Sequence, residues 1–247
     1  MATFPNFDSA YKSLIRSLIA TPRFRSAPRG MNILEDMNVS YTVDDLEHPH
    51  IDFRATAVPE RQATYDKYAQ KELEWYLSGN LQASSAPSKF WLKLADAKGE
   101  ITSNYGFMMI HDAKYPTCDA TAQVSAIDRA VDLLVQDPDS RQVVLHYSEP
   151  KHCWPGNKDV PCTVAAQVLL RDGELHMAVF QRSCDVIKGL SYDVPWHASL
   201  MKMIASKLSE QTKKEVKVGT FTHFVGSLHL YEQDLELAQK IVSGPQA

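Results

Sequence analysis

Residues 160–186, VPCTVAAQVLLRDGELHMAVFQRSCDV, decide the fold. They hold two apolar stretches, 163–170 and 174–181, each of strand length and rich in residues that favour strands. The three residues between them, Arg171-Asp172-Gly173, favour a tight turn, because glycine adopts positive φ without steric cost. The sequence therefore predicts a β-hairpin.

Outside the hairpin, the spacing of apolar residues alternates between helical and extended patterns. Helices are predicted at residues 7–18, 62–78, 119–135, 194–208 and 232–241, and extended segments at residues 31–43 and 217–224. Asp137-Pro138 ends the third of these helices. Helices and a hairpin-connected sheet in one chain indicate an α/β or α+β fold. No repeat, low-complexity tract or long linker divides residues 1–247, so we expect a single domain.

The composition is that of an ordinary globular protein. Hydrophobic residues make up 44% of the chain and charged residues 23%, and the net charge of −4 argues against a dedicated nucleic-acid binder. No apolar run approaches the length of a membrane span, and Asp8, Lys12 and Arg16 interrupt the region where an export signal would be apolar. The four cysteines lack paired CxxC spacing. We therefore expect a cytoplasmic protein with free thiols and with neither a membrane nor a nucleic acid as partner.

Two polar clusters have an ordinary explanation. His48 and His50 lie among acidic residues and can bind a metal, but an exposed acidic loop accounts for them, and no metal is expected. Lys213, Lys214 and Lys217 fit a solvated face better than a nucleic-acid patch.

Cys162 stands just before the first strand of the predicted hairpin. A lone cysteine is often a small buried side chain, whereas a thiolate nucleophile needs a positive charge nearby to lower its pKa. The hairpin brings Arg182 back beside position 162, across the ladder. This geometry favours a reactive Cys162. It says nothing for the other three cysteines, which we interpret as structural: Cys118, Cys153 and Cys184.

Glu72 shares one face of the second predicted helix with Tyr65, Tyr68 and Tyr76. A carboxylate on an aromatic face is desolvated, which raises its pKa and suits it to move protons near neutral pH. The alternative is that Glu72 lies at the margin of this face and reaches water.

Arg141 closes the turn that follows the third predicted helix. It is either an exposed arginine or, together with Arg182 and Ser183, part of a clamp for a dianion, since guanidinium groups match phosphate oxygens.

Three further polar residues have two readings each. Asp193 precedes Val194-Pro195 and is either a helix cap or a functional carboxyl group. His229 and Tyr231 alternate outward near a strand end, where they are either surface groups or hydrogen-bond partners of a sugar hydroxyl.

Several stretches resemble the thymidylate synthase family. They are Pro161-Cys162, QRSCDV at 181–186, Gly189-Leu190, His229-Leu230-Tyr231, DPDSR at 137–141 and ELEW at 72–75. The similarity runs in order over residues 10–235, and its Cys and QRSCD motifs are highly specific. KELEWY at 71–76, SNYG at 103–106, Cys162-Thr163 and GSLH at 226–229 resemble the phage deoxycytidylate hydroxymethylase branch more than the thymidylate synthases proper. The resemblance implies a thymidylate synthase-like fold, with a twisted mixed β-sheet flanked by helices, and a homodimer packed sheet to sheet.

The resemblance also implies roles. Cys162 adds to carbon 6 of a pyrimidine nucleotide, which makes carbon 5 nucleophilic toward the co-substrate 5,10-methylenetetrahydrofolate. Glu72 orders water and moves protons, and Tyr105 lies near the proton taken from carbon 5. The implied substrate-binding residues are Arg29, Gln181, Arg182, Ser183, Asp193, His229 and Tyr231, with Arg141 reaching in from the other subunit. The implied folate-binding residues are Trp91, Asp185 and Gly189. Arg25 is the alternative to Arg29, because SAPRG at 26–30 replaces the family's Arg-Thr-Gly stretch.

Asp193 departs from the asparagine that thymidylate synthases carry after Gly-Leu-Pro-Phe. Uracil offers an N3 hydrogen and an O4 acceptor, whereas cytosine offers an N3 acceptor and an N4 donor. A carboxyl group accepts from N4 and shares a proton with N3, so Asp193 predicts deoxycytidylate over deoxyuridylate. Thr163 replaces the family's histidine, and Gln142 replaces the second arginine of the phosphate clamp.

The expected activity is folate-dependent hydroxymethylation of deoxycytidylate (dCMP) with water. The terminal residues 241–247, IVSGPQA, show no recognisable sealing tail, which favours water over hydride. The first alternative is a dCMP methyltransferase, which yields 5-methyl-dCMP and dihydrofolate. The next is a hydroxymethylase that acts on CMP or dUMP. A non-catalytic nucleotide- or RNA-binding relative is disfavoured, because Cys162 and Glu72 are both intact. If a phage encodes the chain, the host cytoplasm is its expected location.

Overall fold

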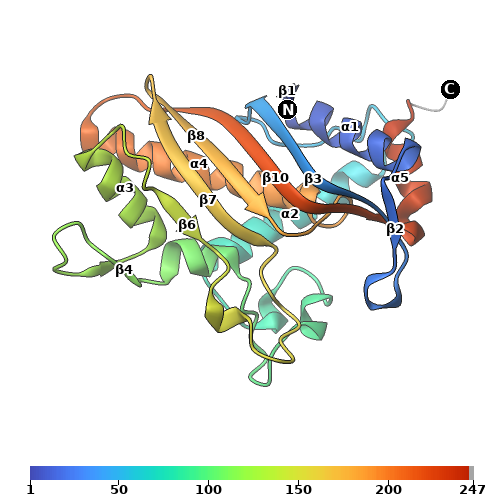
Figure 1. Cartoon of the computed structure of the whole chain (residues 1–247), viewed down its shortest axis with the longest axis horizontal. Coiled ribbons are helices and arrows are strands. Elements are labelled where there is room, and N and C mark those ends of the chain that lie inside the picture. Colours follow the sequence, from blue (N-terminus) through green and yellow to red (C-terminus); the bar gives the residue numbers. More distant parts are fainter. Residues whose placement is uncertain (245–247) are drawn as a thin grey trace. The chain divides into compact units, whose positions relative to one another are not determined.

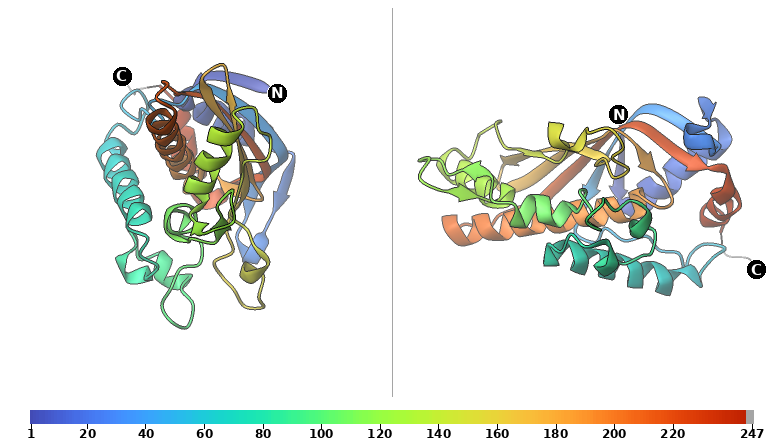
Figure 2. Two further views of the ribbon diagram at one scale, coloured as in Figure 1. Left: turned by 90° about the vertical axis from the view of Figure 1, so that its left-hand side faces the viewer. Right: turned by 90° about the horizontal axis from the view of Figure 1, so that it is seen from below.

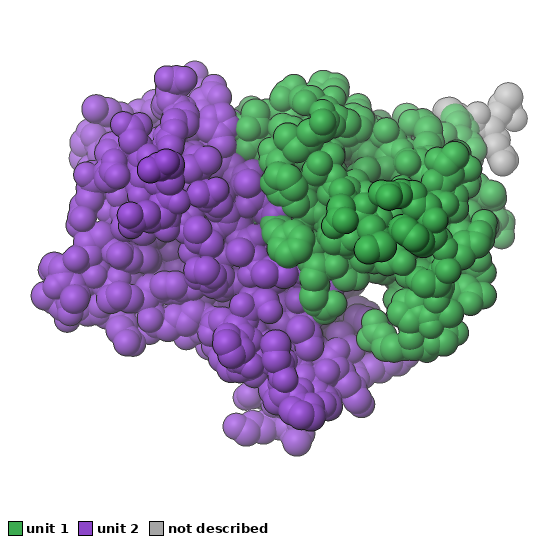
Figure 3. Space-filling view, viewed as in Figure 1, with its two compact units in different colours: residues 1–67, 180–199, 219–247 green, residues 68–179, 200–218 purple. Residues whose placement is uncertain are grey.

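The computed structural model describes residues 1–244 (Figure 1). The chain divides into two compact units (Figure 3). Unit 1 contains residues 1–67, 180–199 and those from 219 onward, and unit 2 contains residues 68–179 and 200–218. The long helices α2 (Arg61–Ser78) and α4 (Leu190–Thr212) each begin in unit 1 and end in unit 2. The single domain expected for residues 1–247 stays a prediction.

The strands of unit 1 form a mixed sheet. Its central strand β3 (Ile33–Asp45) pairs in parallel with β1 (Ala2–Asn6) and antiparallel with β10 (Lys217–Tyr231). Two short strands are added at its ends: β2 (Phe24–Ser26) antiparallel to β3, and β9 (Cys184–Asp185) parallel to β10. The sheet thereby lines up residues 24–26, 33–35, 184–185 and 227–231, which include the predicted site residues Asp185, His229 and Tyr231.

Two helices complete unit 1. Helix α1 (Phe7–Ala20) begins where the Asn6 side chain accepts a hydrogen bond from the Ser9 amide. Its apolar stripe, predicted from the sequence, is buried, and it contacts both β3 and α5 (Leu235–Val242). The two helices lie together on the right in Figure 1.

Unit 2 contains the predicted hairpin. Strands β7 (Thr163–Arg171) and β8 (Glu174–Gln181) follow one another, and β7 also pairs antiparallel with β6 (Val144–His146). Asp172 and Gly173 both adopt positive φ, 51° and 79°, as a two-residue hairpin turn requires. Side chains along β8 alternate between buried and exposed, so one face is packed against the core. The C-terminal half of α4 lies along that face, seen clearly in the right view of Figure 2.

The remaining elements of unit 2 are short, apart from α3 (Ala126–Gln136). They are the 3₁₀ turns Ala83–Ser85, Trp91–Lys93 and Pro150–His152, the π-helical turn Phe107–His111, and the strand pair β4 (Tyr115–Pro116) and β5 (Gln123–Val124). Two more 3₁₀ turns belong to unit 1: Pro28–Gly30 and Glu232–Asp234.

One predicted helix is wrong over its first seven residues. Residues 119–125 form a turn and a short strand, and α3 begins only at Ala126. The Asp119 side chain accepts hydrogen bonds from Thr117 and Thr121, and Ala120 takes a left-handed φ of 59°. Ser125 then caps the helix by accepting from the Asp128 amide. Local side-chain hydrogen bonds thus override the helical spacing of the apolar residues.

Several other boundaries differ by two to seven residues from those predicted, among them the end of α4 at Thr212 and the start of α5 at Leu235. Helix α4 begins at Leu190, four residues early, and β10 runs seven residues further, to Tyr231. The mixed strands flanked by helices confirm the α/β (α+β) fold class. The sheet-to-sheet homodimer stays a prediction.

Candidate active site

In unit 2, Cys162 lies directly before β7 and is half-buried. The next residue, Thr163, is buried, and its amide donates a hydrogen bond to the Tyr105 hydroxyl oxygen at 3.0 Å. Tyr105 is itself buried. The structure thus brings the predicted nucleophile and the predicted tyrosine onto neighbouring segments, although Tyr105 and Thr163 lie 58 positions apart in the sequence.

Gly106 explains how Tyr105 reaches this position. A side chain at residue 106 would collide with the backbone carbonyl of Tyr76 on α2, so only glycine permits this approach. The rings of Tyr76 and Tyr105 stack with centroids 5.8 Å apart. The SNYG motif therefore fixes Tyr105 against the helix that carries Glu72.

Glu72 is buried, with 7% of its surface exposed. The Tyr68 hydroxyl, one helical turn earlier, donates a hydrogen bond to Glu72 Oε1 at 3.0 Å. The reading in which Glu72 reaches water is therefore wrong. A carboxyl group that is buried and held by a phenol is suited to hold and transfer a proton, as the sequence predicts.

Trp91 is connected to Tyr105 by a series of aromatic rings. Its ring lies 5.0 Å from that of Trp75, which stacks on Tyr76 at 5.4 Å. The indole Nε1 atoms of Trp75 and Trp91 are buried, and neither donates a hydrogen bond within residues 1–244. The rings of Trp91, Trp75, Tyr76 and Tyr105 thus form one packed aromatic cluster.

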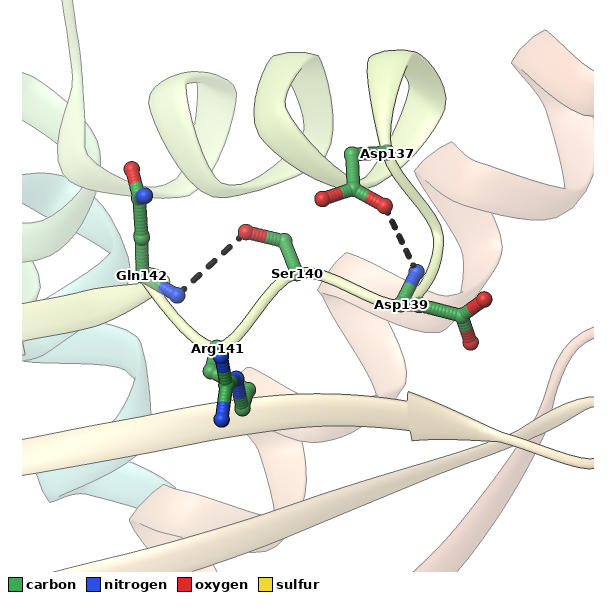
Figure 4. A pocket seen from close by; sticks show the side chains of 5 residues that line it. All are labelled: Asp137, Asp139, Ser140, Arg141 and Gln142. Carbon is green, nitrogen blue, oxygen red and sulfur yellow. Dashed lines mark hydrogen bonds between the residues drawn. The ribbon is translucent and has the colours of Figure 1, made fainter.

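Arg141 belongs to a loop at the end of α3 that lines a shallow pocket of about 410 Å³ (Figure 4). Its backbone carbonyl accepts from Gln167 Nε2 at 3.0 Å, and that of Asp139 accepts from Arg171 at 3.1 Å. The Arg141 side chain is exposed and points away from α3. Strand β7 therefore holds the loop, and the guanidinium group is left at the surface.

In unit 1, the last inward-facing residue of β8 meets the first turn of α4. Gln181 Nε2 donates to Asp193 Oδ2 at 2.9 Å. Burial raises the pKa of Asp193 to about 6, while the hydrogen bond from Gln181 lowers it and the charge of Asp185 raises it further. Because α4 begins at Leu190, Asp193 lies past the cap position, and the reading of Asp193 as a helix cap is wrong.

Unit 1 also contains two buried histidines that the sequence reasoning missed, His197 of α4 and His223 of β10. His197 Nδ1 donates to the backbone carbonyl of Asp193 at 2.7 Å, and His223 Nδ1 lies 2.9 Å from the Tyr41 hydroxyl. Burial lowers the pKa of His197 to about 4 and that of His223 to about 3, so both are neutral at physiological pH. The one sequence signal was their position on buried faces of α4 and β10.

The short strand β9 places Asp185 opposite His229 of β10. The Val186 amide donates to the His229 carbonyl, and Asp185 Oδ1 accepts from the amides of Ile187 and Lys188. Burial raises the pKa of Asp185 above its ordinary value. The two hydrogen bonds and the interaction with His229 lower it, but by less than burial raises it. His229 is buried, so the reading of it as a surface group is wrong.

Two further contacts order this part of unit 1. The Arg182 carbonyl accepts from the Ser227 amide at 3.2 Å, and Gly226 leaves room for that carbonyl, because a Cβ there would lie 2.9 Å from it. Tyr231 packs edge-on against His229, with ring centroids 5.3 Å apart. Arg182 itself is exposed and Ser183 is half-buried. The predicted juxtaposition of Arg182 with Cys162 stays a prediction.

The two candidate N-terminal arginines differ in their contacts. Arg25 forms an ion pair with Glu232 at 3.0 Å. Arg29, at the tip of the loop between β2 and β3 and with a φ of 55°, forms no ion pair within residues 1–244. Arg29 is therefore the better candidate for a phosphate.

The described part of the chain holds no group of three or more His, Cys, Asp or Glu side chains that could bind a metal. None of the helices within residues 1–244 has the length and apolar character to cross a bilayer.

By fold and by residue type, the chain is an α/β protein with a half-buried thiol at Cys162, next to the buried Tyr105 hydroxyl's partner Thr163, and with buried carboxyl groups. The family model for thymidylate synthase matches residues 9–246, and the chain belongs to the thymidylate synthase family. It is therefore an enzyme that transfers a one-carbon unit to a nucleotide, and the family uses methylenetetrahydrofolate as the donor.

Similar proteins support this assignment. The deoxycytidylate 5-hydroxymethyltransferases of Enterobacteria phages T4 and T2 are each 33% identical over 183 residues, which is 71% of this chain and 71% of theirs. The thermostable thymidylate synthase A from Bacillus subtilis has the same fold, with a TM-score of 0.73 over 96% of this chain and 84% of its own, at 20% identity.

Proposed function

We propose that this enzyme hydroxymethylates carbon 5 of deoxycytidylate. The observation that carries the proposal is the buried carboxyl of Asp193, whose pKa of about 6 makes both of its protonation states accessible near neutrality. Its similarity to the phage deoxycytidylate 5-hydroxymethyltransferases supports the same substrate.

The Asp193–Gln181 contact supports a cytosine ring in one orientation. Because Gln181 donates to Oδ2, that oxygen acts as an acceptor, and the proton of the neutral acid belongs on Oδ1. Oδ1 can then donate to cytosine N3 while Oδ2 accepts from the N4 amino group. Uracil has the opposite pattern at both atoms and would leave the pair mismatched.

Residues of unit 2 would carry out the chemistry. Cys162 Sγ would add to carbon 6, and carbon 5 would then bond to the methylene carbon of the folate. Tyr105, beside the nucleophile, would assist removal of the carbon 5 proton as the bond from the methylene carbon to the folate nitrogen breaks and tetrahydrofolate leaves. Glu72 would orient the water that adds to the resulting exocyclic methylene group, after which Cys162 leaves carbon 6. The sum is dCMP, water and methylenetetrahydrofolate giving 5-hydroxymethyl-dCMP and tetrahydrofolate.

The binding residues follow from their chemistry. The carboxylate of Asp185 suits the N–H donors of a pterin, with Gly189 beside it and Trp91 for the aromatic face. Arg29, Arg182 and Ser183 would hold the 5′-phosphate, helped by Arg141 from a second copy of the chain in a homodimer. His229 and Tyr231 would bind the 3′-hydroxyl.

The reaction product tests the proposal. We expect incubation with dCMP and labelled methylenetetrahydrofolate to yield labelled 5-hydroxymethyl-dCMP and tetrahydrofolate. Dihydrofolate and 5-methyl-dCMP as the main products would show a methyltransferase and contradict the proposal. The sequence argument from the C-terminal tail bears on this choice, but residues 245–247 lie outside the described residues.

A further inference from the structure

A buried carboxylate lies three residues before the predicted nucleophile. Asp159 is only 5% exposed, although aspartate is among the residue types least often buried. Within residues 1–244 it pairs with no cation, so neutral donors alone compensate for its loss of water. A buried charge of this kind needs a structural reason.

The donors all come from one short segment. Ser103 supplies two of them, its amide to Asp159 Oδ2 at 2.8 Å and its hydroxyl to Oδ1 at 2.5 Å. The Thr102 hydroxyl donates to the backbone carbonyl of Asp159 at 2.7 Å and lies 3.2 Å from Oδ2. Asn157 adds a turn on the other side, by accepting from the Asp159 amide at 2.9 Å. The backbone and side chain of Asp159 are thus both held.

The same segment holds the chain on the far side of Cys162. Ser103 donates to Asp159, and Tyr105, two positions further along the same segment, accepts a hydrogen bond from the Thr163 amide. Residues 160–162 therefore run between two fixed points, and Pro161 restricts the backbone between them. With only three residues to span the gap, the Cα of Cys162 has little freedom relative to Tyr105.

We propose that Asp159 is a positioning residue that, with Thr102 and Ser103, fixes the Cys162 thiol relative to Tyr105. This inference rests on the proposed function of Cys162 as the nucleophile. Asp159 touches neither substrate nor the reacting atoms. Its contribution is geometric, because a thiol displaced by a fraction of an ångström attacks carbon 6 less often.

Two variants of Asp159 separate geometry from charge. Asp159→Ala removes every side-chain acceptor. Asp159→Asn keeps the arrangement without the charge, because its oxygen accepts from the Ser103 amide and its NH₂ group donates to the Ser103 hydroxyl, which can turn to accept. Asp119→Ala is the matched control, since it also removes several hydrogen bonds to an aspartate of unit 2, in an exposed turn.

Tritium release from carbon 5 of dCMP measures the chemical step. For Asp159→Ala we expect kcat to fall about 30-fold with KM within about threefold of wild type, as expected for a misplaced nucleophile. Asp159→Asn and Asp119→Ala should both stay within about threefold of wild type in kcat. If Asp159→Ala does not fold, Ser103→Ala, which removes a single donor, should show a smaller fall in kcat with KM unchanged.

Two results would overturn the inference. One is a folded Asp159→Ala or Ser103→Ala protein with wild-type kcat. The other is an Asp159→Asn protein as slow as Asp159→Ala, which would show that the charge acts on the thiol directly.

Alkylation of Cys162 by iodoacetamide, followed by peptide mass spectrometry, gives a readout that needs no substrate. We expect the rate to change in Asp159→Ala but not in Asp159→Asn, with Cys118 as internal reference, and an equal rate in all variants contradicts the inference. If wild type releases no tritium from dCMP, the proposed function fails, and the alkylation series still tests the role of Asp159.

Discussion

The two units hold their functional residues by different means. In unit 1, strand register does most of the positioning: β9 sets Asp185 opposite His229, and β10 sets His229 opposite Glu35 of β3. In unit 2, a loop carries Cys162 and the start of a short helical segment carries Tyr105, and individual side-chain hydrogen bonds hold them. Backbone ladders tolerate most substitutions, whereas side-chain clamps depend on single residues.

This difference matches the division of work that we propose. Apart from Arg141 of unit 2, which would reach the phosphate from a second copy of the chain, unit 1 supplies the groups that recognise the nucleotide. Unit 2 supplies the thiol, the tyrosine and the carboxyl group that act on it. Substitutions in unit 1 should therefore alter which nucleotide is bound and how tightly. Substitutions in unit 2 should alter the rate of the chemical step.

The sharpest separation comes from Cys162→Ser. The serine hydroxyl is a far weaker nucleophile at neutral pH, so tritium release from dCMP should fall by at least about 10³-fold. Binding of dCMP, measured by calorimetry, should stay within about threefold, because the recognising groups are in unit 1. If Cys162→Ser released tritium at a rate within tenfold of wild type, Cys162 would not be the nucleophile, and the proposed division of work between the units would be wrong.

A second test concerns the stability of unit 1. The folded pKa of Asp193, about 6, lies above its ordinary value of 3.8. Its stabilising contribution is therefore complete below pH 3.8 and is lost as the pH rises through 6. We expect the free energy of unfolding of wild type, relative to Asp193→Asn, to fall by about 2 kcal/mol between pH 4 and pH 7.5.

Urea denaturation of the two proteins at both pH values measures this change, and other titrating groups cancel in the difference. A difference that does not vary with pH would mean that the carboxyl group is solvated, and the case for a shared proton with cytosine would be lost.

The smallest effect should distinguish the two N-terminal arginines. Arg29→Ala should raise KM for dCMP about tenfold, since it removes a charged hydrogen bond to phosphate, whereas Arg25→Ala should change KM by less than about twofold. Steady-state kinetics with both variants provides the test. If Arg25→Ala raised KM more than Arg29→Ala, Arg25 would be the residue that binds the phosphate, and its ion pair with Glu232 would exist only in the enzyme without substrate.

Elements with a simple periodic pattern could be predicted from the sequence. The stripe on α1 and the RDG turn appear where expected, because each depends on neighbours along the chain. The helix expected at 119–125 does not form, because side-chain hydrogen bonds of Asp119 and Ser125 outweigh the spacing of apolar residues. The spacing of apolar residues gives no information about these side-chain hydrogen bonds, so it could not predict where the helix begins.

The candidate site shows the same limit. The aromatic surroundings of Glu72 follow from helical spacing, and its burial agrees. The contacts of Asp159 with Ser103 and of Gln181 with Asp193 join segments far apart in sequence or on different elements, so no local pattern indicates them. Asp159 offered one signal, a charged residue three positions before the predicted nucleophile.

The central claim is that Asp193 selects cytosine, and the most direct measurement is the ratio of kcat/KM for dCMP to that for dUMP in wild type and in Asp193→Asn. Unlike the acid, an amide cannot share a proton with cytosine N3, and it can turn so that its NH₂ group donates to uracil O4 and its oxygen accepts from the N3 hydrogen, so we expect the ratio to fall by at least about 100-fold. An unchanged ratio would contradict the assignment of Asp193 as the residue that recognises the base.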